Sequence, residues 1–173
     1  MNVILYMAMS LNGLIASPDD KTSWISKEEW DSYSAAVRKA GCLIVGHRTY
    51  DILTKQPEFS EFKDVRVVAV GHSIISLVAS HHAAVSSPQE ALELLKDQPE
   101  VIVAGGGNLN ASFLAENLVD EIYIDIEPIL FTQGIPLLHG LPAERSLEFV
   151  EQKMISANEI QLHYRVVKNA SSL

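Results

Sequence analysis

The chain has 173 residues, of which 47% are hydrophobic and 20% are charged, and its formal net charge is −9. This composition is typical of a globular chain and excludes a disordered one, while the length fits one domain over residues 1–168 followed by a flexible tail over residues 169–173. The acidic balance argues against a nucleic-acid partner, because such proteins present a basic face, but it allows a local positive pocket for an anionic cofactor.

The cysteine content and the length of the apolar runs indicate the compartment. Cys42 is the only cysteine, so no internal disulfide can form, and it lies in the apolar run 42–45, where a buried thiol is expected. No apolar run approaches the roughly 20 residues that cross a bilayer, and the N-terminus lacks the basic segment of a signal peptide. We therefore expect a cytoplasmic chain with no membrane partner.

Apolar runs and turn residues divide the chain into alternating strands and helices. Strands are predicted at residues 3–9, 42–45, 65–70, 101–104, 122–126, 147–155 and 160–167. Helices are predicted at residues 26–39, 49–53 and 88–96 and from the three glycines to about residue 117, with a helical turn at residues 74–79. This order predicts an α/β fold with a mostly parallel central sheet, helices on both faces and an antiparallel C-terminal hairpin.

Three glycines follow the apolar run 101–104 and open a helix. Gly105, Gly106 and Gly107 leave backbone N–H groups bare at a helix start, which suits a pyrophosphate. A flexible strand-to-helix connection is the alternative interpretation. The spacing is neither Gly-x-Gly-x-x-Gly nor a Walker A sequence, so the segment predicts neither a Rossmann domain nor a P-loop.

A further glycine, Gly46, ends the run 42–45 and precedes His47, Arg48 and Thr49. Arg48 can hold a phosphate with two hydrogen bonds, and Thr49 can add a hydroxyl or cap the following helix. The alternative is a solvated Arg48 and a Thr49 that only caps. Because parallel strands bring their carboxyl ends to one sheet edge, where ligands bind, we expect this turn close to the three glycines, with Ser73 in the same layer.

Five segments resemble, in order, the motifs of one superfamily. Residues 9–16 (MSLNGLIA) resemble its MSLDGxIA, residues 23–26 (SWIS) its xWIT, and residues 45–50 (VGHRTY) its GRxTW/Y phosphate turn. Residues 105–121 resemble GGGxLxxxFLxxxLVDE, and residues 128–138 resemble PxxxGxGxPLF. The chain thus resembles the dihydrofolate reductase-like superfamily, and most of all the reductase domain of bacterial bifunctional riboflavin biosynthesis proteins.

The resemblance implies the superfamily's fold, NADPH as cofactor, a small-molecule substrate and a homodimer. The positions that match the family's cofactor contacts are Ala8, Ile15, Gly46, His47, Arg48, Thr49, Ser73, Gly105, Gly106, Gly107, Asn108 and Leu109. The positions implied for substrate contacts are Asn12, Trp24 and Tyr33. Three departures disfavour a phosphoribosylamino-pyrimidine substrate: Ala104 replaces a usual Glu, Asn12 replaces a usual Asp, and residues 51–55 replace a DDPxLT loop.

Two carboxylates are candidates for delivering the proton that reductive hydride transfer requires. Counted from Trp24, Glu29 matches the family's substrate-contacting carboxylate, and Asp125 lies on the run 122–126, where the family contacts its substrate. Each has an ordinary alternative: Glu29 completes a capping box with Ser26, and Asp125 faces solvent. The six histidines show no metal-ligand spacing, so no metal is expected.

Three functional hypotheses follow. The first is an NADPH-dependent reductase that transfers a hydride to a small heterocyclic substrate. The second is the 5-amino-6-(5-phosphoribosylamino)uracil reductase of riboflavin biosynthesis. The third is a non-catalytic NADPH-binding sensor that kept the cofactor turns and lost catalysis.

Overall fold

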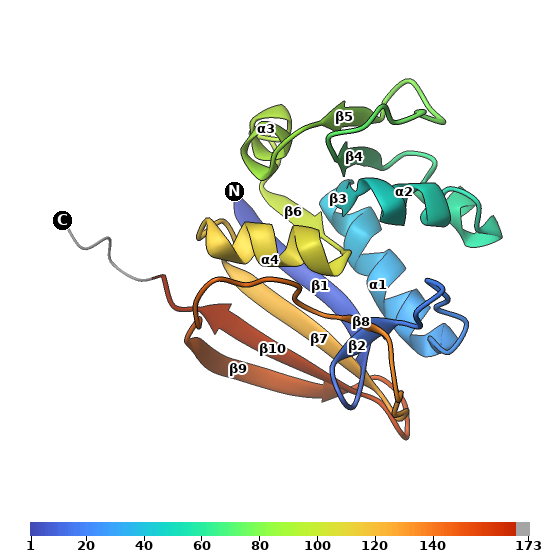
Figure 1. Cartoon of the computed structure of the whole chain (residues 1–173), viewed down its shortest axis with the longest axis vertical. Coiled ribbons are helices and arrows are strands. Elements are labelled where there is room, and N and C mark those ends of the chain that lie inside the picture. Colours follow the sequence, from blue (N-terminus) through green and yellow to red (C-terminus); the bar gives the residue numbers. More distant parts are fainter. Residues whose placement is uncertain (169–173) are drawn as a thin grey trace.

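The computed structural model describes residues 1–168, and within them eight strands form one central sheet (Figure 1). The predicted tail, residues 169–173, lies outside the described residues. In sheet order the strands are β5 (Ala83–Val85), β4 (Arg66–Val70), β3 (Cys42–Gly46), β6 (Glu100–Val103), β1 (Asn2–Ser10), β7 (Glu121–Glu127), β10 (Ile160–Val166) and β9 (Leu147–Met154).

The first six strands in that order run parallel, and β10 pairs antiparallel with both β7 and β9. This confirms the predicted parallel sheet with a C-terminal hairpin. A second, two-stranded sheet pairs β2 (Leu14–Ala16) with β8 (Ile135–Pro136). Strands β2, β5 and β8 were not predicted, because each has only two or three residues and shows no period from which to read a strand.

Helices cover both faces of the sheet, as predicted (Figure 1). Successive side chains of a strand point to opposite faces, so Leu5 packs with α3 and α4 while Tyr6 packs with α1 and α2. The helices are α1 (Lys27–Ala40), α2 (His47–Leu53), α3 (Pro88–Leu94) and α4 (Gly107–Ala115), with a short 3₁₀ helix η1 (Pro57–Phe62).

Two local predictions need correction. Residues 74–79 form no helical turn: they are an extended loop in which Ile74 is 97% exposed, so no buried face stabilises a helix there. Residues 56–63 were predicted as loop, but η1 forms because Phe62 anchors it in the core. The start and end of α1 match the prediction, with Ser26 as N-cap and Gly41 in the left-handed conformation that ends the helix.

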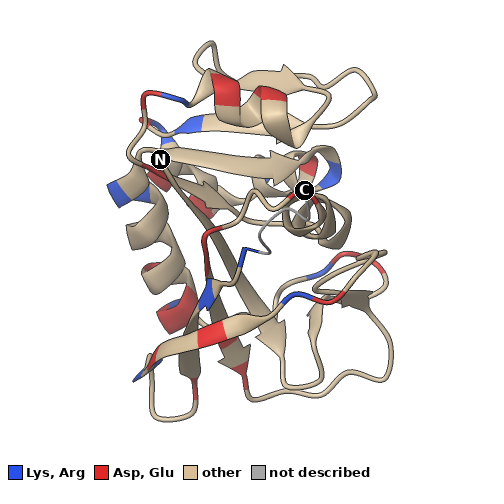
Figure 2. Ribbon diagram, turned by 90° about the vertical axis from the view of Figure 1, so that its left-hand side faces the viewer, with Lys and Arg blue, Asp and Glu red and all other residues tan. Residues whose placement is uncertain are grey.

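Cys42 is fully buried, and burial raises the pKa of its thiol to about 11, which confirms the expectation of an inert core cysteine. No helix within the described residues is long and apolar enough to cross a membrane. Figure 2 shows Lys and Arg scattered singly over the ribbon and not gathered on one face. The expected cytoplasmic location and absence of a nucleic-acid partner stay predictions.

Candidate active site

Two glycine turns meet at the carboxyl edge of the sheet. Helix α2 begins after Gly46 and α4 begins after Gly106, and neither has a side-chain cap for its first N–H groups. The N–H of Gly46 donates to the carbonyl oxygen of Gly105 over 2.7 Å, so the two turns are held together. Bare N–H groups from two helix starts therefore lie side by side, as the sequence predicted.

The fold requires two of the three glycines at residues 105–107. Gly105 has a φ of +81°, which favours glycine, and a Cβ on Gly107 would lie 2.4 Å from the carbonyl oxygen of Pro136. A Cβ on Gly106 would meet only the Oγ1 of Thr49, at an ordinary 3.5 Å. The fold therefore explains two of the glycines, and the side of Gly106 that a Cβ would occupy is open.

Asn110 fixes this turn, and the sequence analysis missed it. Its Oδ1 accepts a hydrogen bond from the N–H of Gly105 over 3.0 Å, and its Nδ2 donates to the carbonyl oxygen of Leu137 over 3.0 Å. Asn110 is fully buried. The available signal was a polar amide in an otherwise apolar helix, since such a group needs partners when it is buried.

The predicted phosphate side chains lie beside the turns but already have partners within the protein. The Arg48 guanidinium forms an ion pair with Asp20, and its side chain is 73% exposed. His47 shares a 2.7 Å hydrogen bond through Nδ1 with the Ser73 hydroxyl, and its Nε2 lies 3.2 Å from Asp51. His47 and Ser73 are thus brought together, whereas Arg48 pairs with Asp20, a partner that local sequence could not reveal.

The other residues predicted to contact the cofactor differ in how exposed they are. Asn108 is exposed, whereas Leu109 packs its side chain in the core, so only the backbone N–H of Leu109 is left to face a ligand. Ala8 lies directly opposite Asp125 on the neighbouring strand, and Ile15 lies on β2; both are buried.

The predicted substrate residues divide into two places. Asn12 and Trp24 both contact Phe131: the Nδ2 of Asn12 donates to its carbonyl oxygen over 2.7 Å, and the Trp24 ring lies edge-on to its ring. Tyr33 instead packs against Tyr6 on the α1 face of the sheet. Tyr33 is therefore the one of the three that lies beside the predicted acids.

Glu29 is free of the capping role that was its alternative. The Oγ of Ser26 accepts a hydrogen bond from the N–H of Glu29 over 2.9 Å, but the N–H of Ser26 donates to the Oε1 of Glu127 over 2.8 Å. The capping box is therefore only half formed, and Glu127 does what the Glu29 side chain would do. Glu29 is 4% exposed, and its carboxyl group has no hydrogen-bond partner among residues 1–168.

Asp125 is buried and lies on the same face as Glu29, so the alternative of a solvent-facing side chain is wrong. It is 1% exposed, and the Tyr6 hydroxyl donates to its Oδ2 over 2.8 Å. The Nε2 of Gln161 donates to its Oδ1 over 2.8 Å. The pairing register makes this possible, because Asp125 lies opposite Gln161 on β10. Tyr6 and Gln161 were not predicted.

The surroundings of Glu29 and Asp125 give the two carboxyl groups different pKa values. Burial, with the nearby charges of Asp125, Glu127 and Glu159, raises the pKa of Glu29 to about 9. Burial also raises the pKa of Asp125, but only to about 6, because the hydrogen bonds from Gln161 and Tyr6 favour its charged form. At neutral pH Glu29 therefore holds its proton while Asp125 is mostly ionised, a division typical of an acid–base pair.

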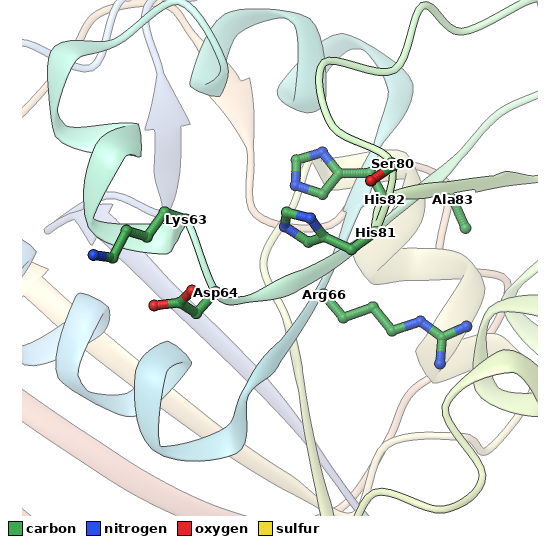
Figure 3. A pocket seen from close by; sticks show the side chains of 7 residues that line it. All are labelled: Lys63, Asp64, Arg66, Ser80, His81, His82 and Ala83. Carbon is green, nitrogen blue, oxygen red and sulfur yellow. The ribbon is translucent and has the colours of Figure 1, made fainter.

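A separate hollow of about 520 Å³ opens at the amino ends of β4 and β5, away from the glycine turns (Figure 3). It is lined by Lys63, Asp64, Arg66, Ser80, His81, His82 and Ala83. Figure 3 shows Lys63 and Arg66 pointing to opposite sides, so their charges do not converge on a ligand.

Within residues 1–168, no group of three His, Cys, Asp or Glu side chains could hold a metal ion.

Comparison with known proteins places this geometry in a family. A model of the RibD C-terminal domain matches residues 1–160. The chain belongs to the RibD C-terminal domain family. This agrees with the resemblance inferred from the motifs.

Individual relatives extend over nearly the whole chain. The uncharacterized protein YwjB of Bacillus subtilis is 28% identical over 167 residues, which are 93% of this chain and 95% of YwjB. Acinetobacter baumannii RibD is similar in structure, with a TM-score of 0.77, 15% identity and coverage of 96% of this chain and 58% of that protein. A second similar structure is the Thermotoga maritima diaminohydroxyphosphoribosylaminopyrimidine deaminase/5-amino-6-(5-phosphoribosylamino)uracil reductase. Its TM-score is 0.71 at 18% identity, and the match covers 96% of this chain and 56% of that protein. The two solved structures share the fold.

Proposed function

We propose that the chain is an NADPH-dependent reductase that transfers a hydride to a small heterocyclic substrate. The observation that carries this proposal is the meeting of two uncapped helix starts, at Gly46 and Gly106, on the sheet edge to which β1 and β7 bring the site of Glu29 and Asp125. Membership of the RibD C-terminal domain family supports an oxidoreductase that uses a nicotinamide cofactor.

The residues present fit such a cofactor. The open side of Gly106 and the first N–H groups of α4 would hold its phosphates, with the Thr49 hydroxyl beside them. Arg48, His47 and Ser73 would hold the 2′-phosphate, for which Arg48 must leave Asp20. When bound, the nicotinamide supplies the hydride.

Glu29 supplies the proton in this mechanism. Reduction of a C=N bond adds a hydride to carbon and a proton to nitrogen, so each turnover needs one acid within reach of the substrate. Glu29 is protonated at neutral pH and has no donor or acceptor partner of its own among residues 1–168. Asp125 stays ionised beside it, and Glu29 regains its proton from water after each turnover.

The second candidate is the reduction of the ribosylamino-pyrimidine in riboflavin biosynthesis. Family membership favours it, whereas Ala104 and Asn12 replace the acidic residues usual in that enzyme. Asn12 is also occupied, because its amide joins the turn after β1 to the backbone of Phe131. Rescue of a riboflavin auxotroph by this chain would favour the pyrimidine as substrate.

Oxidation of NADPH with a panel of substrates tests the proposed function. We expect turnover with at least one compound among dihydropteridines, aminopyrimidines and other C=N heterocycles. NADPH binding without turnover of any heterocycle or small carbonyl compound would instead support the non-catalytic sensor. The absence of NADPH binding would contradict both enzyme proposals.

Replacing Arg48 with Ala tests the choice between NADPH and NADH. We expect the Kd of NADPH to rise about tenfold, because one charge-assisted phosphate contact is lost, and the Kd of NADH to change less than about twofold. Arg165→Ala is a matched control, because Arg165 is also exposed and forms an ion pair with Glu148 on β9. An equal loss for both cofactors would contradict the assignment of Arg48 to the 2′-phosphate.

The chain also offers a surface for the expected homodimer, and we propose that two copies pair through β9. This strand is the edge of the sheet, and all eight of its residues are exposed, including Phe149, Val150 and Met154. An exposed apolar edge strand is a template for another chain. Antiparallel pairing of two copies about Val150 and Glu151 would set Glu148 against Lys153 of the second copy, so the charges are complementary.

Replacing Lys153 with Glu tests this interface. We expect sedimentation to show a dimer for the parent chain and a shift toward monomer, with at least a tenfold weaker dimer, for Lys153→Glu, because like charges then face each other. Lys55→Glu makes the same charge change at an exposed site away from β9. A parent chain that is monomeric at all concentrations would contradict the proposal.

A further inference from the structure

Gln161 makes contacts that the function proposed above does not use. It lies on β10, and its Nε2 is 2.7 Å from the Tyr6 hydroxyl oxygen and 2.8 Å from the Oδ1 of Asp125. The Tyr6 hydroxyl is also 2.8 Å from the Oδ2 of Asp125 and 2.9 Å from the Ser32 hydroxyl. One amide nitrogen therefore bridges a phenol and a carboxylate.

The number of available protons fixes the direction of each bond. The two hydrogens of the Gln161 amide nitrogen go to Tyr6 and Asp125, and the one hydroxyl hydrogen of Tyr6 goes to Asp125. The Ser32 hydroxyl then donates to Tyr6. Both oxygens of Asp125 thus accept hydrogen bonds in this network, and these bonds favour the ionised form of the carboxylate.

We propose that Gln161 is a positioning residue that holds Asp125 in its ionised form and so keeps Glu29 as the protonated acid of the site. Gln161 acts through Asp125 and does so in two ways, by its own bond to the carboxylate and by orienting the Tyr6 hydroxyl toward it. The catalytic part of this proposal rests on the proposed function, but the effect on Asp125 exists in the free protein.

Other titratable groups also act on Asp125, so the effect of Gln161 must be separated from theirs. Tyr6 lies on β1, and Glu29 faces Asp125 from α1. Glu159, between β9 and β10, raises the pKa of Asp125, and Lys153 on β9 lowers it. Glu127 follows on β7, and burial together with the nearby charge of Glu159 raises its pKa. Replacing Gln161 with an apolar residue leaves all these charges in place and removes only the donor.

The test is the titration of the Asp125 carboxyl carbon by NMR in the free protein. We expect Gln161→Met to raise the proton affinity of Asp125 at least tenfold, because a hydrogen bond to a charged group is lost. Gln56→Met is the control, since Gln56 is exposed at the start of η1, away from β9, and its side chain makes no cap hydrogen bond. An unchanged titration in a folded Gln161→Met variant, or an equal change in Gln56→Met, would overturn the proposal.

A second variant and a kinetic measurement cover the remaining outcomes. Should Gln161→Met fail to fold, Gln161→Glu keeps the shape of the side chain, and we expect a still larger rise in the proton affinity of Asp125 from the added negative charge. In an active enzyme, we expect the acidic limb of the pH profile of kcat/KM to move to higher pH in either variant. The size of this move should match the change in the proton affinity of Asp125 that NMR measures. A uniform loss of activity with an unmoved limb indicates a merely structural role and overturns the proposal. Because the NMR titration needs no turnover, failure of the proposed function leaves its result intact.

Discussion

We expect Glu29→Gln to lower kcat/KM by about 10²- to 10⁴-fold, the range for loss of a general acid, and at the same time to stabilise the folded chain above neutral pH. The activity falls because the substituted amide cannot release a proton. The stability rises because the ionised form of Glu29 is unfavourable in its site, where burial and three neighbouring carboxylates surround it. Loss of function with a gain in stability is typical of catalytic groups.

The sign of the stability effect follows from the pKa of Glu29, which is raised from 4.5 to about 9. The folded chain binds more protons than the unfolded chain between these values, so its stability falls as pH rises through that window. Gln has no charge to lose, and the gain from Glu29→Gln is absent below pH 4.5 and grows to the order of 5 kcal/mol at pH 8.

Chemical denaturation at pH 4 and pH 8, with NADPH turnover alongside, measures both effects. The control is Glu28→Gln, which removes an exposed carboxylate from the same helix turn. We expect the control to change activity less than about twofold and stability less than about 0.5 kcal/mol. A Glu29→Gln variant that keeps full activity, or that is less stable than the parent at pH 8, would contradict the role given to Glu29.

We expect Gly106→Ala to raise the Kd of NADPH at least tenfold, and by about 100-fold if the new methyl group displaces a phosphate fully, while leaving the fold intact. The backbone of Gly106 is in the ordinary extended region, and a Cβ there meets only the Thr49 hydroxyl at 3.5 Å. The loss of NADPH affinity would therefore come from lost contacts with the bound cofactor and not from a change in the fold.

The neighbouring glycine provides the matched comparison. Gly107→Ala would push a methyl group to 2.4 Å from the carbonyl oxygen of Pro136, so we expect it to destabilise the chain by about 1 to 3 kcal/mol. Thermal melting separates the two variants, since only Gly107→Ala should lower Tm. Unchanged NADPH affinity in a folded Gly106→Ala variant would mean that the phosphates bind elsewhere.

Much of the fold follows from local sequence because apolar runs and turn residues mark each long element. The meeting of Gly46 with Gly105 was predictable too, because parallel strands end at one edge. The short strand β5 and the 3₁₀ helix η1 escaped prediction, since their stability comes from pairing with β4 and from burial of Phe62.

The polar network of the site could not be read from the sequence. Tyr6 and Asp125 are 119 positions apart, and Ser26 and Glu127 are 101 positions apart. Only the strand register brings Gln161 opposite Asp125, and only the Glu127 side chain releases Glu29 from its capping role. The family resemblance pointed to Glu29 and Asp125 as candidate acids but not to the groups that divide their protonation.

Calorimetric titration of the parent chain with NADPH, repeated with NADH, tests the central proposal most directly. We expect one NADPH to bind per chain with a Kd on the order of 1–10 μM, and NADH to bind at least about tenfold more weakly. No saturable binding of either cofactor at millimolar concentration would contradict the assignment of the two glycine turns to a nicotinamide cofactor.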